Sequence, residues 1–142
     1  MVQAPSKSRA KASLALTGES DTTEPAMAVD EMTSRATDAA AFLKALARER
    51  LVAASDRYAT LIGRKVTRVT LRDTRSRWGS CTADGALMYS WRLIMAPPPV
   101  LDYVAAHEVA HMLEMNHSAD FWAVVERLYP RWQPQRKWLH DE

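Results

Sequence analysis

Apolar residues recur at three- and four-residue steps between about Thr37 and Ile62, which predicts an amphipathic helix with one buried stripe. The members of this stripe are Phe42, Leu43, Leu46, Leu51, Ala54, Tyr58, Leu61 and Ile62. Gly63 follows at once, and glycine commonly ends a helix because it adopts positive φ without steric cost. We therefore expect the helix to end just before Gly63.

After this glycine the pattern changes from helical spacing to short segments rich in β-branched and aromatic residues, which predicts strands. The three segments are 66–71, 77–82 and 86–91. In the last of them Leu87, Tyr89 and Trp91 alternate with other residues and share one face. Asp84 and Gly85 form a strong tight-turn signal between the second and third segments, so we expect a β-hairpin there.

Helical spacing returns after the three prolines at 97–99. Proline is tolerated in the first turn of a helix, so the prolines are compatible with a helix that begins there. We expect a helix from about Pro98 to Met115, with Ser118 as the N-cap of another helix that ends at Pro130. A short last helix would hold Trp138 and Leu139. Residues expected to be buried in the first of these helices are Val100, Leu101, Val104 and Ala105. The order helix, strands, helices predicts an α+β fold.

Residues 1–36 are poor in aromatic residues and rich in Ser, Thr, Ala and Glu, so we predict a disordered tail. Residues 37–142 then form one domain, which suits a chain of 142 residues. No uncharged apolar run is long enough to cross a bilayer, and Lys7, Arg9 and Lys11 interrupt any secretory signal. The single cysteine, Cys81, excludes an intramolecular disulfide and favours a cytoplasmic location.

The net charge of +2 is unevenly distributed along the chain. Six basic residues lie between positions 64 and 77, opposed only by Asp73: Arg64, Lys65, Arg68, Arg72, Arg75 and Arg77. Such a run can attract nucleic acid or an acidic substrate. A solvated strand face is the more common explanation of such a run, and we favour it, with nucleic-acid binding kept as the alternative.

The candidate chemistry lies in His107-Glu108-Val109-Ala110-His111. Two histidines four residues apart project from one face of a helix and can reach one metal ion. Glu108 is offset by about 100° from His107 and can stand beside the metal, where it accepts a proton from water as a general base. This HExxH spacing is the form that zinc peptidases use.

A catalytic zinc needs a third protein ligand and an open position for water. His117 is the natural candidate, because it follows His111 by six residues, beyond the expected end of the helix. The chain must turn back between them, and Asn116 is a residue type that tolerates the left-handed conformation of such turns. Because Cys81 is the single cysteine, a zinc site built from several cysteines is excluded. Zn²⁺ held by His107, His111 and His117 is therefore the expected cofactor.

Several further residues are candidates for supporting this site. Donors toward the charge that develops on a substrate oxygen are Arg77, Tyr103 and Asn116, although an ion pair or a packed helix face also explains the first two. Metal-bound histidines usually donate their second N–H to an oxygen acceptor. Glu114 and Asp120 are near enough in sequence for that role, and they would serve equally as surface charges.

The chain resembles the YgjP-like metallopeptidases over residues 40–142. The segments that carry the resemblance are RSRWGSC at 75–81, WRLIMAP at 91–97, VAAHEVAH at 104–111, EMNHS at 114–118 and Phe121-Trp122. The resemblance implies a zincin-like α+β fold, with a small antiparallel sheet packed on the HExxH helix and flanking helices. It also implies a protein or peptide substrate, three histidine ligands and Glu108 as general base.

Two other functions remain open at this stage. A zinc hydrolase of nucleotide phosphoanhydrides would use the same metal-activated water and the basic run at 64–77. Members of the resembled family carry a β-rich section before the helix that starts near Thr37, and we expect that section to be missing here. The third possibility is therefore a truncated, metal-stabilised module that binds nucleic acid or protein, which would not need Glu108.

Overall fold

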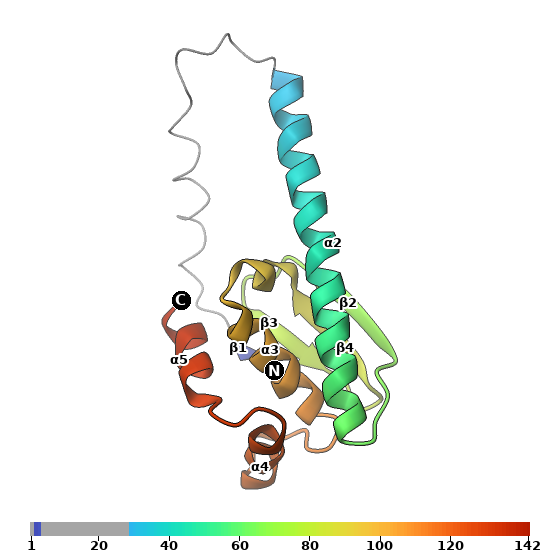
Figure 1. Ribbon diagram of the computed structural model, residues 1–142, viewed down its shortest axis with the longest axis vertical. Helices are drawn as coiled ribbons and strands as arrows, with labels where there is room; N and C mark the ends of the chain where they lie inside the picture. Colours follow the sequence, from blue (N-terminus) through green and yellow to red (C-terminus); the bar gives the residue numbers. More distant parts are fainter. Residues whose placement is uncertain (1, 4–28) are drawn as a thin grey trace.

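The computed structural model describes residues 2–3 and 29–142, which form an α+β fold (Figure 1). Its sheet has the order β1-β3-β4-β2. The strands are β1 (Val2–Gln3), β2 (Arg68–Arg72), β3 (Arg77–Cys81) and β4 (Ala86–Ser90). The α+β class predicted from the element order is therefore confirmed.

The sheet is mixed, whereas the sequence predicted an antiparallel one. β3 and β4 form the expected antiparallel hairpin, but β2 pairs with β4 in parallel register. The reason is that β2 does not lie beside its neighbour in sequence, β3, because β4 lies between them. Local alternation predicts a strand but not which neighbour it pairs with, so the strand order could not be predicted from the sequence pattern.

The β3–β4 turn requires its glycine, as Asp84-Gly85 indicated. Gly85 has φ +93°, and a Cβ at this position would lie 2.7 Å from the backbone oxygen of Lys65. The Gly85 carbonyl in turn accepts a hydrogen bond from the Thr67 N–H at 2.9 Å, which joins the hairpin to the segment before β2. Leu87 and Tyr89, predicted to share one face of β4, are both buried, whereas Trp91, predicted on the same face, begins a 3-10 helix after the strand.

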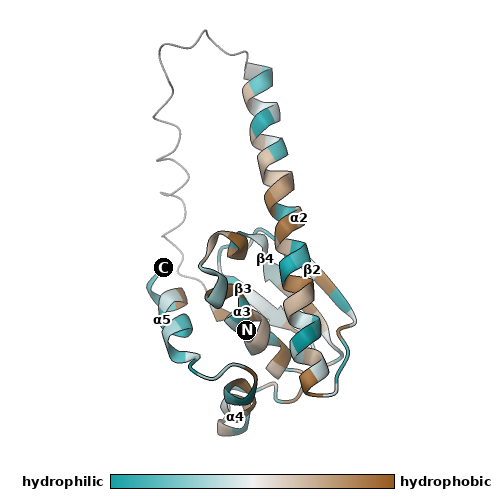
Figure 2. Cartoon of the chain, viewed as in Figure 1, coloured by the Kyte–Doolittle hydropathy of each residue, from teal (hydrophilic) through white to brown (hydrophobic). Residues whose placement is uncertain are grey.

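The long helix α2 (Val29–Leu61) begins well before the predicted start near Thr37. Its C-terminal half buries Leu51, Ala54 and Tyr58 against the domain, while its N-terminal half projects beyond it (Figures 1 and 2). Phe42 and Leu61 were predicted in the buried stripe, but they are 66% and 62% exposed. Phe42 lies on the part of α2 that projects beyond the domain, and Leu61 is the last residue of the helix, so neither is covered by the sheet or by α3. Gly63, with φ +70°, follows the helix as predicted.

The C-terminal part consists of a 3-10 helix η2 (Trp91–Met95) and the helices α3 (Pro98–Ala110), α4 (Ala119–Leu128) and α5 (Gln133–Asp141). α3 is the central helix, because it contacts α2, α4, α5 and β3. It ends at Ala110 rather than near Met115. The Ser118 side chain caps α4 by accepting the Phe121 N–H at 3.4 Å, as expected from the sequence.

A buried hydrogen bond links the sheet to α2. The Tyr89 and Ser55 hydroxyls lie 2.8 Å apart, and both residues are fully buried. A buried hydroxyl without a partner costs about 1–3 kcal/mol, so this pair fixes how β4 sits on α2. The result is a firm platform of sheet and α2 on which α3 lies.

The tail predicted over residues 1–36 is only partly within the described residues. Residues 1 and 4–28 lie outside them. Of the remainder, Val2–Gln3 form β1 and residues 29–36 belong to α2, so neither part is irregular. Among the described helices, none is both long and apolar enough to cross a membrane.

Candidate metal centre

His107 and His111 lie at the end of α3 and face the same side of it. His107 is in the last turn, and His111 is the C-cap residue with φ −66° and ψ −14°, which keeps the helical direction for one more residue. Both side chains are 3% exposed. The four-residue spacing therefore places two imidazoles together although the helix is shorter than predicted.

His117 completes the cluster from the loop between α3 and α4. Its Nε2 lies 3.3 Å from Nε2 of His107. One ring nitrogen from each of His107, His111 and His117 lies within 4.8 Å of the other two, an arrangement that could hold a metal ion. The turn does not use a left-handed Asn116, because Arg131 is the non-glycine residue with positive φ among the described residues. Instead, the chain turns back through tight bonds from Leu113 and Glu114 to the Ala110 carbonyl.

The second ring nitrogen of two histidines meets an oxygen. Nδ1 of His107 lies 3.0 Å from the Tyr103 hydroxyl, and Nδ1 of His111 lies 2.9 Å from the backbone oxygen of Glu114. These contacts orient both rings so that Nε2 faces the cluster. Glu114 was a predicted partner, but it acts through its carbonyl and not its carboxylate. Asp120, the other candidate, is exposed on α4.

Aromatic rings on α4 form one wall of the cluster. Phe121 stacks on His111 with ring centroids 4.4 Å apart, and the Trp122 ring lies 6.0 Å from that of His117. Phe121 is fully buried, so it shields His111 from water on that side. Burial lowers the pKa of His111 to about 4, which leaves the imidazole neutral at pH 7. Neutral imidazole is the form that binds metal ions.

Glu108 lies under the sheet beside the cluster and is fully buried. Burial raises its pKa to about 7, while the nearby backbone of Val2 and the charge of Arg77 lower the pKa. Gly79 on β3 makes room for it, because a Cβ at Gly79 would lie 3.1 Å from Cγ of Glu108. A carboxyl group held dry at such a pKa can exchange a proton near neutral pH.

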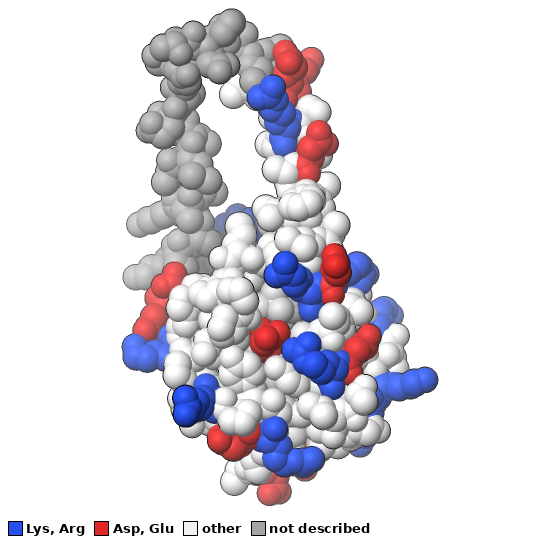
Figure 3. All heavy atoms as spheres, viewed as in Figure 1, with Lys and Arg blue, Asp and Glu red and all other residues white. Residues whose placement is uncertain are grey.

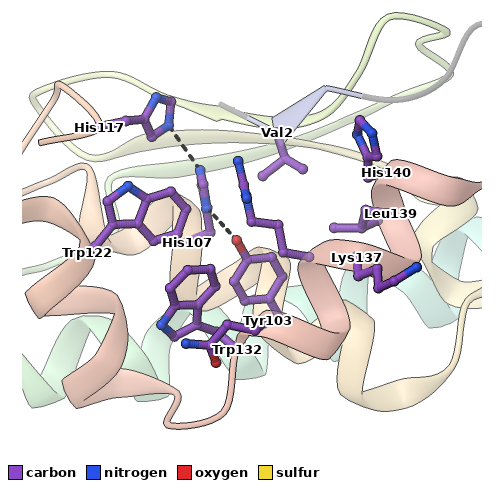
Figure 4. A pocket seen from close by; sticks show the side chains of 11 residues that line it. Val2, Tyr103, His107, His117, Trp122, Trp132, Lys137, Leu139 and His140 are labelled. Carbon is purple, nitrogen blue, oxygen red and sulfur yellow. Dashed lines mark hydrogen bonds between the residues drawn. The ribbon is translucent and has the colours of Figure 1, made fainter. Parts of the chain in front are cut away.

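A cleft of about 910 Å³ opens next to the histidines (Figure 4). His107, His117 and Trp122 line one part of it, and side chains of α5 line the other. Val2 points into the same space from β1. The guanidinium of Arg136 also lines the cleft and lies 5.2 Å from the Trp122 ring, which places a positive charge there.

The basic run at 64–77 is divided between two places. Arg68 and Arg72 lie on β2, the edge of the sheet opposite β1. Basic side chains on that side of the molecule are interspersed with acidic ones (Figure 3). Arg77 instead begins β3, where it faces Gln3 in the register with β1. Arg68 and Arg72 therefore lie on the far edge of the sheet from β1, and the prediction of nucleic-acid binding stays a prediction.

Comparison with protein families identifies the family to which the chain is similar. The model of the YgjP-like metallopeptidase domain matches residues 6–142. The chain belongs to the YgjP-like metallopeptidase family. The match starts at residue 6, so it includes most of the segment predicted as a tail as well as every helix that lines the cleft.

A solved structure has a similar fold. It is the crystal structure of the metallopeptidase zymogen of Pyrococcus abyssi abylysin, with a TM-score of 0.53 and 19% sequence identity. The similarity covers 64% of this chain and 89% of that one. No match was found among curated proteins. The resemblance to the YgjP-like family and the zincin-like fold expected from the sequence are thus confirmed.

Three features of the site escaped the sequence analysis. Tyr103 was considered as a donor to substrate, but it contacts His107; its position four residues earlier on the same helix was the available signal. For Arg136 and Val2, no feature of the sequence indicated that they would lie near the histidines. They reach the cleft from α5 and from β1, and only the packing of distant segments brings them there.

Proposed function

We propose that this YgjP-like protein is a zinc-dependent peptidase in which His107, His111 and His117 hold the metal and Glu108 is the general base. The observation that carries the proposal is the cluster of three imidazole nitrogens within 4.8 Å, with a fully buried carboxyl group on the adjacent residue. Membership of a metallopeptidase family supports peptide hydrolysis as the reaction.

The donor set fits zinc. Three neutral imidazoles with an open side is a common arrangement of catalytic zinc sites, and zinc accepts nitrogen ligands at about 2.0–2.1 Å. Two such ligands in a tetrahedron lie about 3.3 Å apart. The Nε2 atoms of His107 and His117 are 3.3 Å apart. The oxygen partners of His107 and His111 also match the second contacts that zinc-bound histidines require.

When bound, zinc supplies Lewis-acid chemistry, which polarises a carbonyl and makes water more acidic. The chain supplies the rest. Glu108 accepts a proton from the attacking water and returns it to the leaving amine, while the buried surroundings exclude bulk water. Tyr103 holds the ring of His107 in place. The positive charge of Arg136 faces the cleft and attracts a substrate carbonyl or carboxylate.

A peptide suits the space beside the cluster. The cleft of about 910 Å³ is lined on one side by Val2 of β1, at the edge of the sheet, and sheet edges are the places where extended peptides pair through main-chain hydrogen bonds. The similar structure is that of a metallopeptidase zymogen, which fits the same conclusion at the level of the fold. A nucleotide phosphoanhydride suits it less, because Arg68 and Arg72 lie on the opposite edge of the sheet.

The test is Glu108→Gln, which keeps the shape of the side chain but removes its basicity. We expect zinc binding to persist and the hydrolysis of casein and of short peptides to fall about 10²–10⁴-fold, the usual contribution of a general base. Zinc content by atomic absorption and initial rates at saturating metal measure the two properties separately.

Glu114→Gln is the matched control, because that residue contacts His111 through its backbone oxygen, which the substitution leaves in place. Its rate should equal that of the native chain. Equal turnover by Glu108→Gln would remove the general-base role. Nucleoside triphosphates assayed in parallel separate the peptidase from the phosphoanhydride hydrolase, and a chain that binds zinc but turns over neither substrate is the non-catalytic module.

A further inference from the structure

The N-terminal residues of the chain form a strand on the edge of the sheet nearest the metal centre. β1 pairs antiparallel with β3, and Val2 lies opposite Gly79 while Gln3 lies opposite Arg77. β1 also contacts α3, the helix that carries the histidines. Residues from the start of the chain and from position 107 onward thus meet at one place (Figures 1 and 4).

Without β1, strand β3 would be the edge of the sheet on that side. An unpaired edge presents a row of N–H and C=O groups that readily pair with another extended chain. Gly79 in the middle of β3 lies directly over Glu108, at the 3.1 Å spacing described above. A chain paired with this edge therefore passes across the proposed general base.

Val2 makes the contacts that a bound peptide residue would make. Its backbone lies close enough to the Glu108 carboxyl group to lower the pKa of that group. Its side chain is 8% exposed and lines the cleft together with Tyr103 and His107. Figure 4 shows the Val2 side chain pointing from β1 toward these two residues. Both the main chain and the side chain of this residue thus occupy the space beside the histidines.

From these contacts we infer that β1 is an internal competitor, which occupies the peptide-binding edge of β3 and must leave before a peptide substrate can pair there. The inference rests on the proposed peptidase function and adds a means of restraining it. The occupant is a named segment of this chain, Val2–Gln3, held by pairing with β3 and by the burial of Val2.

The weak pairing of β1 with β3 is what a removable occupant requires. β1 has two residues, and its register shifts between Val2 and Gln3, so few main-chain bonds hold it. A segment tethered to its own site nevertheless competes at an effective concentration of about millimolar. If β1 occupies the edge nine-tenths of the time, the apparent affinity for an external peptide falls about tenfold.

The experiment compares peptide binding by the full chain and by a chain lacking residues 1–5. The probe is a synthetic heptapeptide of the N-terminal sequence, MVQAPSK, labelled with fluorescein at its C-terminus and measured by anisotropy with zinc present and with a chelator. We expect about tenfold tighter binding to the shortened chain, and slower hydrogen exchange of the β3 amides when the peptide is added. Equal affinity for the two chains would overturn the inference.

Val2→Asp in the full chain provides a second test that keeps every residue. A carboxylate at this buried position is unfavourable beside Glu108, so β1 should detach and the affinity for the peptide should rise in the same direction. The matched control is Met32→Asp, which makes the same kind of change on α2 at a residue that is 54% exposed. Its peptide affinity should equal that of the native chain.

The two proposals fail in different ways. Tighter peptide binding by the shortened chain without any peptide hydrolysis contradicts the peptidase function but supports the inference that β1 competes with peptides. Hydrolysis that depends on Glu108, together with equal peptide affinity in all variants, contradicts the competitor alone. Thermal unfolding of each variant is measured first, and if the shortened chain does not fold, Val2→Asp decides the outcome.

Discussion

Tyr103 shows at the scale of one residue how the helix that carries the ligands also orients them. It lies four residues before His107 on α3, so its hydroxyl reaches Nδ1 of that histidine at 3.0 Å. The sequence suggested Tyr103 as a donor to substrate. Its contact with His107 makes it a positioning residue instead, since a histidine fixed at Nδ1 presents Nε2 to a metal.

We predict that Tyr103→Phe weakens zinc binding about 10–100-fold, the usual effect of losing an outer partner of a ligand. Competition with a chromophoric zinc chelator measures this change. The control is Tyr129→Phe, which alters a tyrosine whose ring contacts that of Tyr103 at 6.2 Å. Unchanged zinc affinity in Tyr103→Phe would show that the hydroxyl does not orient His107.

At the scale of the elements, the approach of β3 to α3 determines where Glu108 can lie. A Cβ at Gly79 would meet Cγ of Glu108 and the Met88 carbonyl at 3.1 Å, and Cδ1 of Tyr89 at 3.2 Å. These spacings are tighter than ordinary contacts and involve backbone as well as side-chain atoms. The glycine is therefore needed for the close packing of strand on helix, and not for an unusual φ.

Gly79→Ala should destabilise the fold by about 1–3 kcal/mol, the typical cost of overpacking a close-packed interior. It should also lower the hydrolysis rate, because Glu108 must shift. Urea unfolding and initial rates measure these effects. Ser80→Ala is the control, since the neighbouring residue of a strand points to the other face. A Gly79→Ala variant as stable and active as the control would mean that β3 moves away without cost.

At the scale of the whole molecule, the metal centre joins helix α3 to the loop that precedes α4. His107 belongs to α3, His111 caps it, and His117 lies in the loop before α4. A metal that binds all three in the native state and few of them in the unfolded chain stabilises the fold by mass action. The loop and α4 are the parts that gain most from this linkage.

Zinc at a hundred times its dissociation constant adds about 2.7 kcal/mol to the free energy of unfolding. For a domain of this size, we expect the thermal midpoint to rise by at least about 5 °C relative to chelator-treated protein. His117→Ala should lose most of the rise, and His140→Ala should retain it. Scanning calorimetry with zinc or chelator tests this, and an equal rise in His117→Ala would place the third ligand elsewhere.

The sequence determined the local features of this protein. Helical spacing around His107 and His111 and the tight-turn pair Asp84-Gly85 were predictable, because each depends on residues within a few positions of one another. The third histidine could be proposed on the same basis. The residues of the candidate site could thus be predicted from the sequence, but the residues that surround them could not.

The tertiary structure decided which distant segments contact these local features. It placed β4 between β2 and β3, left Phe42 exposed on an apolar stripe, and brought Val2 and Arg136 to the histidines. Local periodicity carries no record of such contacts, because pairing and burial depend on segments far apart in the chain. For this reason the histidine cluster could be predicted from the sequence, while the strand that lies beside it could be found only in the folded structure.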